Sequence, residues 1–122
     1  MLSIQNLIDD KKCYEQVRQM RWPEQVSCPR CGSEEIAKRG FHNTERHRQR
    51  YDCRNCNTGF DDLTYTIFEG HRQPLKVWMI CLYFMGLNLS NRQIAFELNL
   101  NKDDVYAMTM QLREGIVVKK RQ

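Results

Sequence analysis

Apolar side chains recur at helical spacing in the first part of the chain. Within residues 3–21, the positions that fit one face of a helix are Ile4, Leu7, Ile8, Tyr14, Val17 and Met20. Ser3 is a candidate N-cap, and the pair Asp9 and Asp10 marks a place where the helix could be interrupted. The helix is expected to end before Pro23, because the residue that precedes a proline avoids helical geometry.

The middle of the chain, residues 26–68, has the pattern of short strands and turns. Arg46, Arg48 and Arg50 occupy every second position, so on a strand they would share one face at a spacing of about 6.6 Å. Between residues 60 and 68, aromatic and aliphatic side chains interleave with threonines, a composition that is typical of β-structure. We expect a short antiparallel sheet in this segment.

From Pro74 onward the pattern becomes helical. Pro74 suits the first turn of a helix over residues 75–85, and Gly86 is expected to end it. Ser90 is a candidate N-cap for a helix at 91–98, and Asn101 for a helix at 102–115. The predicted fold class is therefore small α+β: an N-terminal helix, short antiparallel strands and then three helices.

These patterns divide the chain into four segments. We expect an N-terminal helical segment at 1–25, a ribbon at 26–70, a three-helix domain at 71–118 and a basic tail at 119–122. The helix at 75–86 is apolar nearly all round, which indicates burial on most sides. The N-terminal helix, a second copy of the chain or a further domain could cover it.

Charge is concentrated in the ribbon segment. The net charge is +4, and residues 28–60 carry seven basic against four acidic side chains. The longest apolar run, residues 77–87, is shorter than the ~20 residues that span a bilayer, and the first 12 residues lack the apolar core of a signal peptide. We expect a cytoplasmic, nucleoid-associated protein, in which a reducing environment favours metal binding by cysteines over disulfides.

Four cysteines form two Cys-x-x-Cys hooks. Their spacing, C-x2-C-x21-C-x2-C, is close to that of structural zinc sites, and the ligands would be Cys28, Cys31, Cys53 and Cys56. Gly32 and Asn57 follow the hooks and readily adopt the left-handed conformation that turns a backbone around a metal. Four thiolates leave no open position, so the sequence predicts one structural Zn²⁺ and loss of the 28–60 fold without it.

Other readings of the cysteines and histidines remain open. A thioredoxin-type redox motif lacks its strand–helix–strand context here, and a rubredoxin-type iron site would use the same four sulfurs. Cys13 and Cys81 fall inside apolar helical patterns and are interpreted as small buried hydrophobes. His42 and His47 are interpreted as solvated or phosphate-facing, because four thiolates already complete a tetrahedron.

The two last predicted helices have the spacing of a helix-turn-helix. Ala95 is the small residue where the two helices would touch, Asn99 suits the left-handed turn, and Val105 would pack back. An ordinary helical hairpin without a role in DNA binding is the alternative. As a recognition helix, residues 102–115 would send Lys102, Thr109 and Arg113 to phosphates, while Asn101 and Tyr106 would reach base edges.

Acidic residues complicate the DNA-binding hypothesis. Asp103 and Asp104 suit the positive end of a helix dipole but would repel phosphates. In the ribbon segment, the predicted phosphate contacts are Lys38, Arg39, Arg46, Arg48 and Arg50.

Taken together, these motifs resemble a known family. The order "RWPEQVSCPRCGS", a basic spacer, "QRYDCRNCNTGFDDLTYTIFEG", "PLKVWM" and "SNRQIAFELNLNKDDVYAM" is similar to the N-terminal region of insertion-sequence (DDE-type) transposases. The resemblance implies a zinc ribbon followed by a helix-turn-helix that binds the terminal repeats of the element. In that family a catalytic domain with an Asp-Asp-Glu triad follows.

Two features depart from this family. Tyr65 stands where such proteins are expected to have glycine, and the sequence stops at Gln122, before a nuclease domain. Asp61, Asp62 and Glu69 are clustered in one short segment and are interpreted as solvated charges or caps.

The predicted function is therefore a zinc-dependent module that binds double-stranded DNA and is not itself an enzyme. It could be a truncated or domesticated transposase derivative, or a regulator. The alternatives are an interaction or dimerisation module that uses the ribbon and the helix at 75–86, a redox carrier, and an active recombinase.

Overall fold

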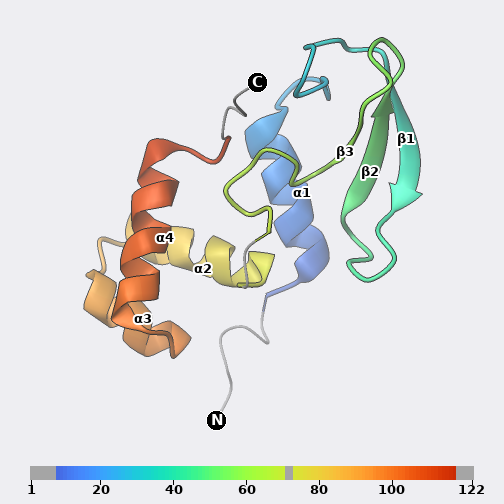
Figure 1. The fold of residues 1–122 in the computed structure, drawn as a ribbon. Coiled ribbons are helices and arrows are strands. Elements are labelled where there is room, and N and C mark those ends of the chain that lie inside the picture. Colours follow the sequence, from blue (N-terminus) through green and yellow to red (C-terminus); the bar gives the residue numbers. More distant parts are fainter. Residues whose placement is uncertain (1–7, 71–72, 118–122) are drawn as a thin grey trace.

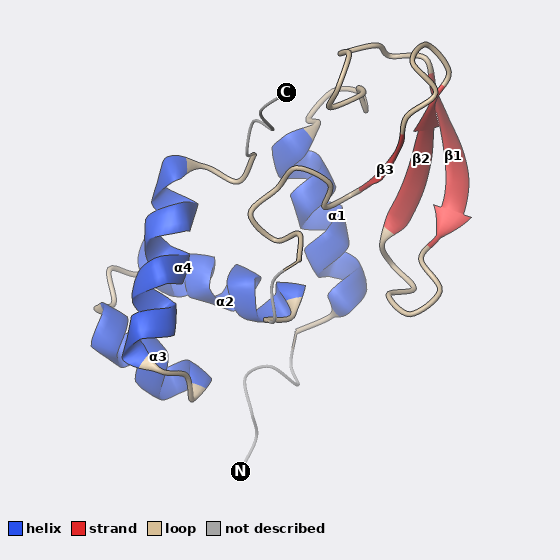
Figure 2. Cartoon of the chain, in the orientation of Figure 1, coloured by secondary structure: helices blue, strands red, loops and turns tan. Residues whose placement is uncertain are grey.

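The computed structural model describes residues 8–70 and 73–117, which form four helices and one small sheet (Figures 1 and 2). In chain order the elements are α1 (Asp10–Arg21), β1 (Ile36–Phe41), β2 (Gln49–Cys53), β3 (Gly59–Asp61), α2 (Leu75–Gly86), α3 (Asn91–Leu98) and α4 (Lys102–Glu114). This arrangement confirms the predicted α+β class. The proposed N-cap Ser3 and the basic tail lie outside the described residues.

The helix α1 begins at the acidic pair rather than before it. Asp9 is the N-cap, and its carboxylate accepts a hydrogen bond from the backbone N–H of Lys11 at 2.9 Å. The helix ends at Arg21 with Trp22 as its C-cap, as the proline that follows Trp22 predicts. Its buried face consists of Cys13, Tyr14 and Val17.

The sheet has three antiparallel strands in the order β1-β2-β3. Ile36 pairs with Cys53, and Tyr51 pairs with Phe60, so the hook cysteine Cys53 and two aromatic rings are fixed by the strand register. The predicted β-structure after Asp61 was wrong. Residues 62–70 form turns with a single bridge from Thr66 to Val117. These turns place Leu63, Ile67 and Phe68 against helices instead of in the sheet.

Tyr65 explains part of this turn. Its φ is +63°, the left-handed conformation in which a glycine would be free of steric cost, and its backbone N–H donates to Glu69 Oε1 at 3.3 Å. The structure thus forms at Tyr65 the kind of turn that glycine favours.

The larger core lies between α1, residues 63–68 and the three C-terminal helices. The helix α2 is at its centre, with Trp78 and Cys81 fully buried and the Trp78 ring edge-on to Phe68 at 5.4 Å. The N-terminal helix therefore supplies the cover that the apolar pattern of α2 requires. Of the apolar residues in and directly after α2, Tyr83 and Leu87 remain more than half exposed.

The turns between the last helices follow the predicted capping residues closely. Ser90 caps α3 and forms a reciprocal capping box with Gln93, and Asn99 adopts the left-handed conformation at φ 55°. One detail differs: α2 continues through Gly86, and the positive φ after it belongs to Asn88.

Candidate metal centre and nucleic-acid interface

The four hook cysteines converge at one point. The Sγ atoms of Cys28, Cys31, Cys53 and Cys56 all lie within 4.8 Å of one another. Two cross-hook distances are shorter: 3.6 Å between Cys28 and Cys56, and 3.5 Å between Cys31 and Cys53. Zinc–sulfur bonds of about 2.3 Å in a tetrahedron require sulfurs about 3.8 Å apart, so the cluster fits a four-thiolate zinc site.

Local backbone geometry aims the thiols at this point. Gly32 (φ +78°) and Asn57 (φ +60°) both take the left-handed conformation that was predicted for them. The backbone N–H groups of Arg30 and Cys56 point at Cys28 Sγ and Cys53 Sγ at 3.4 and 3.5 Å. Such N–H groups stabilise negative charge on the thiolates that a metal requires.

The environments of the thiols differ across the cluster. Burial raises the pKa of Cys28 to about 11, whereas a hydrogen bond with the Thr58 hydroxyl at 3.1 Å lowers the pKa of Cys56 to about 6. A bound divalent cation would hold all four groups as thiolates. The cluster is thus a zinc-ribbon-type site for one structural zinc ion, closed to substrate because all four coordination positions come from the protein.

The remaining cysteines and the hairpin histidines stand apart from this cluster. Cys13 and Cys81 are 4% and 0% exposed within the larger core, which confirms their interpretation as small hydrophobes. His42 Nδ1 lies 3.2 Å from the Thr44 hydroxyl, and the exposed His47 lies in the turn before β2. Neither histidine belongs to the metal-ligand group found in the described part of the chain.

A small aromatic core supports the ribbon. The rings of Tyr51 and Phe60 are stacked with centroids 5.1 Å apart, and Trp22 meets Tyr51 edge-on at 5.6 Å. The guanidinium of Arg21 lies over the Trp22 ring at 4.4 Å. The residue that ends α1 is therefore part of the ribbon core.

Asp62 is the centre of a buried polar network, and its interpretation as a solvated charge was wrong. Its side chain is fully buried and accepts hydrogen bonds from the Gln49 backbone N–H (2.7 Å), the Tyr51 hydroxyl (2.8 Å) and Arg18 Nε (3.1 Å). Burial raises the pKa of Asp62, while these hydrogen bonds act in the opposite direction. The carboxylate connects β2 to α1 and has no free oxygen surface for catalysis.

Two arginines of α1 complete this connection. Arg18 donates to the His47 carbonyl at 2.6 Å, and Arg21 donates to the carbonyls of Asp62 at 2.8 Å and of Thr64. Burial lowers the pKa of Arg21 to about 10. Neither contact was predictable from the sequence, because two arginines in the last turn of a helix carry no signal of their distant partners.

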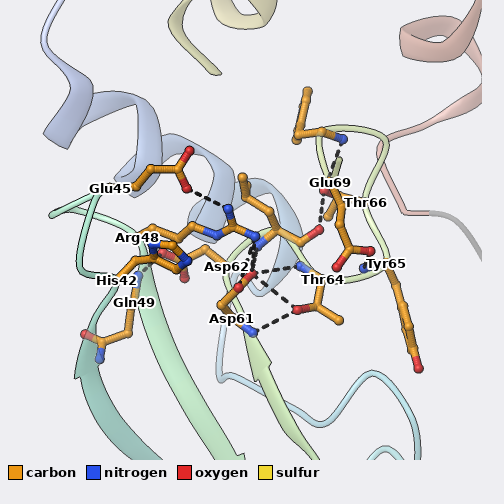
Figure 3. A network of polar contacts seen from close by, with 12 residues as sticks. His42, Glu45, Arg48, Gln49, Asp61, Asp62, Thr64, Tyr65, Thr66 and Glu69 are labelled. Atoms are coloured by element: carbon orange, nitrogen blue, oxygen red, sulfur yellow. Dashed lines mark hydrogen bonds and ion pairs between the residues drawn. The ribbon is translucent and has the colours of Figure 1, made fainter. Parts of the chain in front are cut away.

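Arg48 does not join a basic strand face. Its side chain is 16% exposed and forms ion pairs with Glu45 at 2.6 Å and with Asp61 at 3.0 Å (Figure 3). Asp61 also accepts from the N–H groups of Leu63 and Thr64, which confirms its reading as a cap. The predicted row on one strand was wrong, since β2 begins at Gln49 and Arg46 lies in the preceding turn.

The other four ribbon residues that were predicted to contact phosphates are exposed. Lys38, Arg46 and Arg50 form no ion pair within residues 8–70 and 73–117, whereas Arg39 pairs with Asp52 at 2.5 Å on the surface. An exposed pair of this kind contributes little to stability, so Arg39 can exchange Asp52 for another anion at low cost. These four side chains lie on β1, on β2 and in the turn between them.

The pair α3–α4 has the packing that the sequence predicts. Ala95 and Val105 are buried at 7% and 0% exposure, and the Asn99 turn separates the two helices. Leu100 donates its N–H to the Ala95 carbonyl at 2.9 Å across this turn.

The surface of α4 corrects the predicted DNA contact of Thr109 and gives Asn101 a capping role. Thr109 is fully buried, and its hydroxyl lies 3.2 Å from Asn91 Oδ1 on α3. The Asn101 side-chain oxygen is the N-cap acceptor for the Asp103 N–H at 2.7 Å. The buried position of Thr109 excludes it from any surface contact.

The basic residues of α4 lie on the side opposite Asp104, but the exposed Asp103 lies only about 60° around the helix from Tyr106. At 100° per residue, Lys102, Tyr106 and Arg113 lie within about 40° of one another, next to the face that meets α3, and all three are exposed. Asp104 lies on the opposite side, about 180° from Arg113.

Comparison with known proteins agrees with this site. Residues 8–59 match the family described as the transposase zinc-ribbon domain. An uncharacterized protein in the transposable element ISH50 of Halobacterium salinarum is 32% identical over 107 residues, which are 87% of this chain and 35% of that protein. No solved structure matches the chain.

Residues 8–59, which include all four hook cysteines, are therefore similar to a transposase zinc-ribbon domain. The chain spans about a third of the length of the relative from ISH50. Within the described residues, no helix is long and apolar enough to cross a membrane.

Proposed function

We propose that this chain is a zinc-dependent module that binds double-stranded DNA and recognises the ends of a mobile element. The observation that carries the proposal is the transposase-type zinc ribbon with exposed basic residues that no carboxylate neutralises among the described residues. A structural zinc supplies no chemistry to bound DNA in this proposal. It holds the sheet from which the basic side chains project.

The first proposed surface is the ribbon. Lys38, Arg46 and Arg50 contact phosphates, and Arg39 joins them by exchanging its partner Asp52. The ion pairs of Arg48 exclude it from this set, so the ribbon provides up to four phosphate contacts.

The second proposed surface is α4, acting as the recognition helix of a helix-turn-helix. Lys102 and Arg113 contact phosphates, and Tyr106, 56% exposed between them on the same side, reaches into the groove. Asp104 on the far side of α4 then faces away from DNA, which removes part of the conflict between acidic residues and phosphate.

The module is proposed to bind DNA without cutting it. The three clustered carboxylates already have structural roles: Asp62 is buried under three donors, Asp61 pairs with Arg48, and Glu69 accepts from the Tyr65 N–H. A two-metal nuclease site needs carboxylates that converge on exposed ions.

Selection of bound sequences from random duplexes with the zinc-loaded chain tests this proposal. A defined motif is expected, and Arg46→Gln and Arg50→Gln should each weaken its binding. Arg54→Gln is the matched control, since Arg54 is an exposed arginine at the opposite end of β2. Failure to enrich any duplex, or equal weakening by all three variants, would refute the proposed ribbon surface.

A further inference from the structure

The two proposed DNA surfaces lie on different sides of the molecule. Figure 1 shows the turn between β1 and β2 on one side of α1 and α2, and the pair α3–α4 on the other. Among the described elements, no strand packs against α3 or α4. One short stretch of groove cannot therefore contact both surfaces at once.

The β1–β2 turn and the start of α4 nevertheless lie toward the same end of the molecule. In Figure 1 the β1–β2 turn and the start of α4 lie toward the lower part of the view, whereas the cysteine hooks lie at its upper edge.

The helix α1 belongs to both halves of the molecule. Its apolar face, with Tyr14 and Val17, is part of the core that contains α2, α3 and α4. Its polar face joins the ribbon: Arg18 contacts Asp62 at 3.1 Å and the His47 carbonyl at 2.6 Å. The last contact fixes the turn that carries Arg46.

Two further contacts fix the position of the ribbon relative to the C-terminal helices. Phe68, in the segment that leaves the ribbon, packs edge-on against Trp78 of α2. The Ile67 N–H donates to the Ile116 carbonyl at 2.9 Å, so the end of α4 is also tied to the ribbon's exit. The ribbon and α3–α4 are thus joined through packed and hydrogen-bonded elements instead of a free linker.

We propose that the chain reads a bipartite DNA site, in which the ribbon and α4 contact two separate segments of one duplex at a fixed spacing. This inference rests on the proposed function, because it assigns the arrangement of the DNA that the two surfaces bind. A flexible linker would let each surface find its segment at variable distance, whereas a rigid joint fixes both the distance and the helical phase.

The test leaves the protein unchanged and alters the DNA. Phosphates on a selected duplex are ethylated at random, and those whose modification prevents binding of the zinc-loaded chain are mapped. Two clusters separated by an unaffected stretch are expected. Arg46→Gln should reduce the sensitivity of one cluster only, and Lys102→Gln that of the other cluster only.

Insertion of 5 base pairs between the clusters rotates one segment by about half a turn and moves it by about 17 Å. One of the two clusters should then be lost, and the magnitude of the slope of log affinity against log salt should decrease by about 2 if the lost cluster is that of α4, or by about 3 if it is that of the ribbon. The control is the same insertion placed outside both clusters, which should change neither the map nor the slope.

The possible failures are distinguishable. No binding to any duplex would overturn both the proposed function and this inference. Binding through one continuous cluster, or two clusters that persist with an unchanged slope after the central insertion, would overturn the bipartite rigid site alone.

Discussion

Asp62 offers the sharpest test of how the two halves of the molecule are joined. Replacing it with alanine removes the acceptor of the Gln49 N–H, the Tyr51 hydroxyl and Arg18 Nε at once. Arg18 is 27% exposed and can turn to water, but Gln49 and Tyr51 are only 8% and 2% exposed. The two buried donors would be left without partners.

The expected cost follows from these two donors. A buried donor without an acceptor costs about 1–3 kcal/mol, which gives about 2–6 kcal/mol for the pair. Removal of the carboxylate also relieves the cost of keeping a charge buried, so we expect the free energy of unfolding to decrease by about 3 kcal/mol. Asp62→Asn retains one acceptor oxygen and should lose less.

Urea unfolding of the zinc-loaded chain at fixed free zinc measures this cost, with the fluorescence of Trp22 beside Tyr51 as a reporter of the ribbon. Glu24→Ala is the matched control, because Glu24 is exposed and forms no ion pair within the described residues. Its effect should stay within about 0.5 kcal/mol. A loss below 0.5 kcal/mol for Asp62→Ala would refute the reasoning that this carboxylate organises the joint.

Three further predictions concern the metal, the turn and α4. Chelation of zinc should unfold residues 28–60 but leave much of the helical signal, because the larger core contains no hook cysteine; loss of all helical circular dichroism would contradict this. Asn99→Ala should lower the free energy of unfolding by about 1 kcal/mol, since alanine is strained at φ +55°, whereas Asn99→Gly should be nearly neutral; equal effects in urea unfolding would argue against the strain. Thr109→Ala should reduce stability and leave DNA affinity almost unchanged, while Tyr106→Ala should do the reverse; the opposite pattern in paired unfolding and DNA-binding titrations would reject the assignment of the α4 surface.

The parts of this fold that depend on local chemistry were predictable. Cysteine spacing located the metal centre, and the capping residue Ser90 located the start of α3. The left-handed positions at Gly32, Asn57 and Asn99 were also foreseen, because few residue types adopt that conformation easily. Each of these features is encoded within a few residues of sequence.

The features that depend on distant partners were not predictable. Arg48 looked like one more phosphate-facing arginine, and only the fold reveals that Glu45 and Asp61 neutralise it. Asp62 looked solvated, because nothing near it in sequence indicates that Arg18 on α1 packs against it. Thr109 was misassigned for a related reason, since it lies at the edge of the apolar stripe and the contact with α3 decides its burial.

The salt dependence of binding to a selected duplex tests the central claim most directly. With Lys38, Arg39, Arg46, Arg50, Lys102 and Arg113 as phosphate contacts, log affinity of the zinc-loaded chain should fall against log salt with a slope of about −5. After zinc removal the ribbon contacts should disappear, and the slope should become shallower, at about −2. A slope near zero for the zinc-loaded chain, or the same slope with and without zinc, would contradict a zinc-organised DNA-binding surface.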